Sequence, residues 1–219
     1  MATVQTVSYE GFTSTHDITV SAVGSGNGIV VGFKFSDAVS LTSVTDNQSN
    51  TYDQDLTFAA VQSTNHYVYS EWNITNGPVT ITITTGSTTF VSAFVQEVSG
   101  RGATPTVDTT SVASSSGNTV AATQTVSNAD AHACGMVQFT DAEAFTPDTG
   151  YSRFPTSGSV YQLWCYDDDV GSGSQTLGGT STTNPSWSLS FVAYSVAAGA
   201  NPKGPLGHPL HGPFGGPIN

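Results

Sequence analysis

Short runs of alternating apolar and polar residues, each ended by glycine, asparagine, aspartate or serine, constrain this chain more than any other feature. Alternation with period two predicts strands that bury one face, and no stretch has a convincing helical period. Many short strands separated by such turns predict an all-β sandwich or barrel. The strands are expected at 3–9, 17–23, 28–35, 39–45, 56–61, 66–73, 78–84, 89–98, 105–112, 119–126, 131–139, 160–167, 174–180 and 186–197.

The expected strands form two series that resemble each other, which indicates a weak internal duplication with halves at about 1–100 and 101–199. Two sandwiches, or one sandwich of two similar halves, would both fit this pattern. Three pairs of segments carry the similarity: 29–38 with 133–142, 69–72 with 161–164, and 90–98 with 187–196.

Turn and aromatic motifs that follow one another in order favour a single sandwich. They are 44–52, 69–72, 95–100, 145–151 and 186–194. In this order they resemble a widespread β-sandwich module of bacterial extracellular and phage structural proteins. The resemblance covers roughly residues 15–197. It implies one jelly-roll or immunoglobulin-like antiparallel domain over 1–199, a building or surface role, and no catalytic residues.

Composition limits the partners of the chain. Four Lys and Arg residues against 16 Asp and Glu give a net charge of −12, which argues against binding nucleic acid or anionic membranes. No apolar run reaches the ~20 residues of a membrane span. Low charge (9 %) with much Ser, Thr and Gly fits an extracellular or virion-surface protein. Residues 1–7 read as a strand and not as a signal peptide. Either an exported form was trimmed before this numbering or the protein leaves the cell by another route, such as release of a virus particle by lysis, and the second option favours a viral structural protein.

The segment 200–219 is an extended tail, and its residues 204–219 are four tetrapeptides, each with one proline and one large apolar residue. Proline at every fourth position excludes a helix and leaves an extended strand or polyproline II. In a strand, all four apolar residues lie on one face, and the prolines remove N–H groups from one edge only. The expected subunit-contact residues are Pro205, Leu206, Pro209, Leu210, Pro213, Phe214, Pro217 and Ile218.

Two interpretations of this tail remain open. Pro/Gly-rich termini are usually flexible linkers. However, a solvated linker does not need one large apolar residue per repeat, which favours a docked tail. The nineteen residues 201–219 at ~3.1 Å each reach roughly 60 Å, whereas a body of this size is roughly 42 Å wide. The tail is therefore long enough to reach a neighbouring subunit.

Several residues are candidates for covalent modification or ordinary packing. Cys134 and Cys165 are either two buried small hydrophobic residues or a possible disulfide. Asn47 and Asn73 begin N-glycosylation sequons, which matter only on a glycosylating export route.

Candidate chemical sites are weak. Asp167, Asp168 and Asp169 could bind Ca²⁺, but a solvated acidic turn is the simpler interpretation. The same applies to Asp46, Asp53 and Asp55. Glu71 and Glu97 could form a glycosidase-type pair, although nothing in the sequence brings them together. The histidines His16, His66 and His132 are scattered, and His208 with His211 lacks further metal ligands. We expect no enzyme activity and no cofactor.

The aromatic residues allow two interpretations. Trp72, Trp164 and Trp187 with the 8 tyrosines could form a sugar-stacking platform, but Trp72 and Trp164 are expected in the core. The sequence thus predicts a structural subunit of a helical, pilus-like extracellular filament or virion surface, which polymerises with itself through the tail. The alternative is a carbohydrate-binding or adhesion module that binds surface glycans and does not use the tail.

Overall fold

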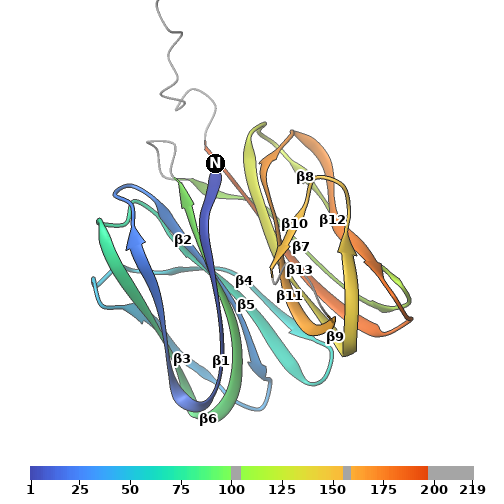
Figure 1. The fold of residues 1–219 in the computed structure, drawn as a ribbon, viewed down its shortest axis with the longest axis horizontal. Coiled ribbons are helices and arrows are strands. Elements are labelled where there is room, and N and C mark those ends of the chain that lie inside the picture. Colours follow the sequence, from blue (N-terminus) through green and yellow to red (C-terminus); the bar gives the residue numbers. More distant parts are fainter. Residues whose placement is uncertain (100–104, 155–158, 197–219) are drawn as a thin grey trace, which may run out of the picture.

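The computed structural model describes residues 1–99, 105–154 and 159–196, and every regular element in them is a β-strand. These strands form two antiparallel sheets, one from each half (Figure 1). The predicted all-β antiparallel sandwich is confirmed, whereas the tail lies outside the described residues. The strands are β1 (Ala2–Val23), β2 (Gly28–Ser36), β3 (Leu41–Asp46), β4 (Asp53–Ala60), β5 (Thr64–Glu71), β6 (Gly77–Ser99), β7 (Thr106–Ser116), β8 (Thr119–Val126), β9 (Ala131–Pro147), β10 (Ser152–Phe154), β11 (Ser159–Val170), β12 (Gly173–Ser181) and β13 (Ser186–Ser195).

The two halves repeat one pattern of strand pairing. β2 pairs with β5 and β6, and β9 pairs with β11 and β13 in the same manner. β1 runs along β6, and the separate strands β7 and β8 run along β13 and β12. When 29–35 is aligned with 133–139, as the sequence comparison has it, the pairing register places Cys165 and not Tyr161 at the position of Tyr69. The two predicted equivalences therefore differ by four residues and do not hold together.

β1 and β6 continue where the sequence predicted breaks. Their pairing is shifted between Thr13 and Thr15 but does not end. Such bulges bend a strand without terminating it, so each strand has one part in the layer beside β2 and another part in the layer beside β3. The four strands predicted at 3–9, 17–23, 78–84 and 89–98 are therefore only two strands, β1 and β6. In the second half, the sequence missed the short β10 and the extension of β9 beyond Phe139.

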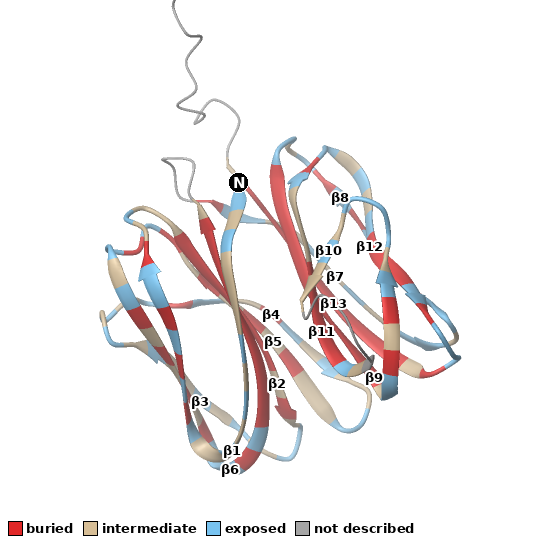
Figure 2. Cartoon of the chain, viewed as in Figure 1, coloured by how far each residue is buried: buried red, intermediate tan, exposed pale blue. Residues whose placement is uncertain are grey.

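Apolar residues form three buried clusters. One lies inside each half, and the third lies between the two halves, where the strands of one half face those of the other. Figure 2 shows that buried residues are concentrated on β2, β6, β9 and β13. Burying a large apolar side chain stabilises the fold by ~1.5–3 kcal/mol. The cluster between the halves, which we call the shared cluster, is therefore a major contribution to the free energy that holds the halves together. Its buried members are Met1, Val30, Leu56, Val68, Trp72, Phe94, Val98, Cys134, Met136, Trp164, Val192 and Tyr194.

Trp164 of the second half packs directly against Gly32 of the first half. A Cβ atom on Gly32 would lie 2.1 Å from Cζ3 of Trp164, so glycine is what leaves room for the indole. The ring also stacks on Phe94, with centroids 6.3 Å apart, and its Nε1 donates to Gln96 Oε1 at 2.9 Å. Trp164 is completely buried and Trp72 is 9 % exposed, which confirms their predicted place in the core.

Candidate functional site

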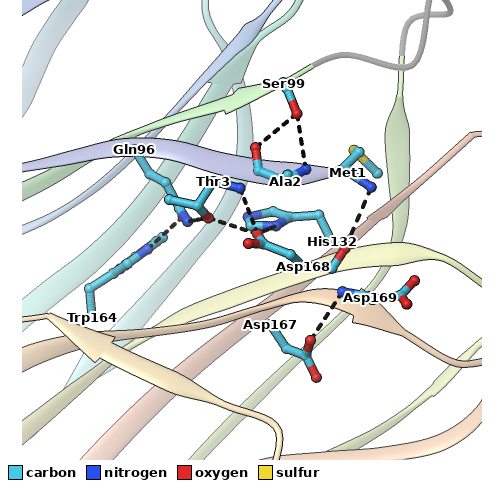
Figure 3. Close-up of polar contacts among 10 residues, drawn as sticks. All are labelled: Met1, Ala2, Thr3, Gln96, Ser99, His132, Trp164, Asp167, Asp168 and Asp169. Atoms are coloured by element: carbon cyan, nitrogen blue, oxygen red, sulfur yellow. Dashed lines mark hydrogen bonds and ion pairs between the residues drawn. The ribbon is translucent and has the colours of Figure 1, made fainter.

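The acidic run at the end of β11 contributes to the contact between the halves. Asp168 Oδ1 accepts hydrogen bonds from the Thr3 amide (2.9 Å), the Thr3 hydroxyl (2.7 Å) and His132 Nδ1 (3.1 Å), as Figure 3 shows. Asp167 accepts from the Asp169 amide, and Asp169 is exposed. All three residues belong to β11 and not to a turn, and Asp168 joins β11 to β1 and β9, so the interpretation as a solvated acidic turn is wrong for Asp168, whereas Asp169 is solvated as expected.

The contact of Asp168 with His132 is made by a neutral imidazole. Burial lowers the pKa of His132, and the hydrogen bond and charge of Asp168 only partly oppose this. Burial alone would raise the pKa of Asp168, but hydrogen bonds from His132 and Thr3 outweigh it and hold that pKa below its usual range. Because a carboxylate can only accept, the imidazole carries its hydrogen on Nδ1.

The other candidate carboxylates also serve the fold. Asp46 accepts from the amides of Gln48 and Asn50 in its own turn, and Asp55 accepts from the Tyr194 hydroxyl across the halves at 2.6 Å. Both were expected to be solvated, and this expectation is wrong. Asp53 is exposed, as expected.

Glu71 and Glu97 lie in one row across the first sheet. Ile29 of β2 stands opposite both, so they are two strand spacings apart, roughly 10 Å. The carboxylate of Glu97 accepts from the Gly24 amide at 2.8 Å and from Asn27 Nδ2 at 2.6 Å. These bonds commit Glu97 to the turn between β1 and β2.

A second polar contact between the halves surrounds Gln138 of β9. Its Oε1 accepts from the Thr64 hydroxyl at 2.9 Å and from His66 Nε2 at 2.8 Å. Its Nε2 donates to the Val61 carbonyl and to Gln62. Burial lowers the pKa of His66 to about 3, so this imidazole is neutral at physiological pH. His16 is also buried, which lowers its pKa.

Cys134 and Cys165 are free and buried. Cys134 belongs to the cluster between the halves and Cys165 to the cluster inside the second half. Their side chains therefore leave opposite faces of one sheet, and the possible disulfide is not formed.

The possible glycosylation sites Asn47 and Asn73 are both exposed, next to the strand ends of the first half. Asn47 is already engaged, because its Oδ1 accepts from the Thr80 amide at 2.8 Å. Asn73 has a positive φ of 66°.

The described residues hold no group of three or more His, Cys, Asp or Glu side chains arranged for a metal ion. No helix long and apolar enough to cross a membrane occurs in the described part of the chain.

A groove of about 250 Å³ opens where the first half meets β11. One wall comes from β1 and β6, and the other comes from the beginning of β11. We call it the inter-half groove; its lining is Ser8, Tyr9, Glu10, Ser92, Phe94, Val160, Tyr161 and Gln162. Tyr161 is 57 % exposed at its rim.

An exposed aromatic pair continues this groove. Phe12 and Phe90 lie opposite each other on β1 and β6, two residues beyond Glu10 and Ser92. Alternate residues share a face, so the pair lies on the face that lines the groove. Phe12 is 74 % exposed and Phe90 is 47 % exposed. This pair is not evident from the sequence, because the two residues meet only through the pairing register of β1 and β6.

The fold itself does not require aromatic residues at this place. The register relates Phe12 to Ser116 and Phe90 to Ser186, which lie opposite each other on β7 and β13. The second half thus carries two serines where the first half exposes two phenylalanines. Exposed apolar clusters on a protein surface indicate a binding site more often than a structural need.

The predicted subunit-contact residues of the tail, from Pro205 to Ile218, and the pair His208 and His211 lie outside the described residues. Comparisons with protein-family models, curated proteins and solved structures found no match to this chain. The resemblance to bacterial and phage modules therefore stays a prediction, and any function must be argued from the residues themselves.

Proposed function

We propose that this protein is the structural subunit of a helical extracellular filament or of a virion surface, and that its C-terminal tail docks on a neighbouring subunit. The tetrapeptide repeat carries the proposal. It places Leu206, Leu210, Phe214 and Ile218 at a constant spacing, with proline at constant positions between them. Such a segment adds to the sheet edge or groove of another subunit, as in donor-strand assembly.

The energy of such a joint is sufficient for assembly. Four apolar side chains at ~1.5–3 kcal/mol each contribute roughly 6–12 kcal/mol before the cost of ordering the tail. Proline lowers that cost because it restricts the free tail. A contact between different surfaces of identical subunits does not close on itself, so it propagates a filament.

The test replaces the four apolar tail residues by serine in the full chain. We expect filaments from the natural chain and monomers from the variant, by negative-stain microscopy and light scattering. A second variant that ends at Asn201 should also remain monomeric, like the serine variant. Assembly of the serine variant to the same extent as the natural chain would contradict the proposal.

Carbohydrate binding is a second candidate, favoured by a groove of about 620 Å³ in the second half. Tyr151, Tyr166 and Arg153 line it together with several hydroxyl side chains. Aromatic faces and hydroxyls are suited to sugar rings. Glycan-array binding by the full chain, lost in Tyr166→Ala and unchanged in the four-serine tail variant, would support this function.

A further inference from the structure

We propose that the inter-half groove, together with the open edge of β1, receives the C-terminal tail of a neighbouring copy of this chain. The inference rests on the proposed function and names the surface that the tail would bind. Three observations support it: the spacing of the aromatic residues, the free edge of β1, and the distribution of charge.

The spacing of aromatic residues matches the spacing of the tail. Phe90 and Phe94 are four residues apart on β6 and share a face, which separates them by ~13 Å. Apolar residues of the tail also recur every four residues, for example Leu210 and Phe214. An extended tail can therefore place one apolar side chain beside the exposed phenylalanine pair and the next in the groove above Phe94.

The edge of β1 offers backbone partners to such a strand. In the described part of the chain, β1 pairs with β6 and with no other strand, so its outer edge is open along the groove. The tail has one edge that can pair, because its prolines occupy alternate positions of the other edge. In a tail strand paired along β1, the apolar residues Leu206, Leu210, Phe214 and Ile218 would all point to the same face of the sheet. That face could be either of the two. Among the described residues of β1 and β6, an exposed aromatic pair that could cover them lies on the groove face.

Strand direction favours a neighbouring copy as the source of the tail. The described chain leaves β13 next to the beginning of β1 (Figure 1), where Tyr194 pairs with His132 beside Asp168 and Thr3. A tail that ran from there along β1 would be parallel to it. Every strand pair in the described residues is antiparallel. A second copy can supply its tail from the opposite end.

Charge distribution supports the same partner. All 16 Asp and Glu residues lie before residue 170, and the segment 197–219 contains Lys203, His208 and His211 but no acidic side chain. Glu10 is an exposed carboxylate in the groove lining. A weakly basic, apolar tail is thus complementary to an acidic body with an apolar groove.

The first test replaces residues of the first half by those that the second half has at the equivalent positions. Phe12→Ser with Phe90→Ser gives the first half the residues that the second half has at the same place, so the fold should be retained. We expect the critical concentration for assembly to rise at least about tenfold, with unchanged circular dichroism and thermal unfolding. Val112→Ser removes a valine that is 45 % exposed on β7, away from the groove, and should assemble normally. Tyr161→Ser is a second groove variant and should also weaken assembly.

The second test locates the tail directly. A photo-cross-linking benzoylphenylalanine replaces Phe214 in the full chain, and ¹⁴N- and ¹⁵N-labelled chains are mixed before assembly. Mass spectrometry should find cross-links between differently labelled chains, on peptides of β1, β6 or β11. Cross-links to another surface, or within one chain only, would overturn the inference.

The outcomes separate this inference from the proposed function. If the four-serine tail variant fails to assemble but Phe12→Ser with Phe90→Ser assembles normally, the tail is the connector and the groove is not its receptor. If the four-serine variant still assembles, the proposed function itself is wrong. Glycan-array binding that is lost with the groove phenylalanines but independent of the tail would assign the groove to carbohydrate and overturn the inference.

Discussion

Single polar side chains connect the two halves beside their shared apolar cluster. Asp168 binds Thr3 and His132, Gln138 binds Thr64 and His66, and Asp55 accepts from Tyr194. Each contact joins residues from different halves or different strands of the inner sheets. A buried polar group that loses its partner keeps its desolvation cost, so these contacts fix how the halves fit together.

Replacing Asp168 by asparagine should destabilise the protein. The substitution removes a charged acceptor from the Thr3 amide, the Thr3 hydroxyl and His132. Hydrogen bonds to charged groups contribute ~1.5–3 kcal/mol, and the side chain is 35 % exposed, so we expect a loss of about 1–2 kcal/mol. Urea unfolding measures it. Asp169→Asn is the matched control and should change stability by less than about 0.5 kcal/mol. Equal effects of both substitutions would contradict the role given to Asp168.

Gly32→Ala should test the close approach of the sheets. The new methyl group would overlap the Trp164 ring, which is enclosed on all sides, so we expect a loss of about 1–3 kcal/mol or more. Gly171→Ala is the control, because a Cβ there meets only Gln175 Nε2 at 3.8 Å. A thermal unfolding midpoint unchanged by Gly32→Ala would show that the sheets are less tightly packed.

Individual strands were well predicted from the sequence because their alternation is local. Where prediction failed, the cause lay in pairing. β1 and β6 continue through an irregular stretch in which Gly86 and the neighbouring Ser and Thr residues read as a turn, so the two strands were divided into four. β10 has only three residues and depends on β11 for its pairing.

The candidate sites were less predictable than the strands. Asp168 meets Thr3 across 165 residues of sequence, and Phe12 meets Phe90 only once the register is known. The tail repeat is the reverse case, because its spacing is visible in the sequence alone.

The whole molecule should lose stability in mild acid. His16, His66 and His132 are buried with lowered pKa values, so unfolding lets each bind a proton below the usual pKa of ~6.5. As the pH falls from ~6.5 to the pKa that a histidine has in the folded protein, that histidine lowers the free energy of unfolding by about 1.4 kcal/mol per pH unit. For His66, with a pKa of about 3, this window extends well below pH 5.

His66→Gln should make the pH dependence shallower. Glutamine does not titrate, so the slope between pH 6.5 and 5 should fall by about one proton, or ~1.4 kcal/mol per pH unit. Urea unfolding at several pH values measures the slope for both proteins. Groups such as Asp55 titrate alike in both and cancel in the comparison. Parallel curves would mean that His66 is protonated in the folded state as well.

The cluster shared by the two halves imposes an order on biosynthesis. The first half leaves the ribosome with Val30, Val68 and Phe94 on a face that has no cover until β9, β11 and β13 have been made. During that interval a nascent chain presents a wide apolar sheet, the kind of surface that chaperones bind. Completion of folding therefore waits for translation to pass Tyr194, and premature termination before that point leaves an aggregation-prone fragment.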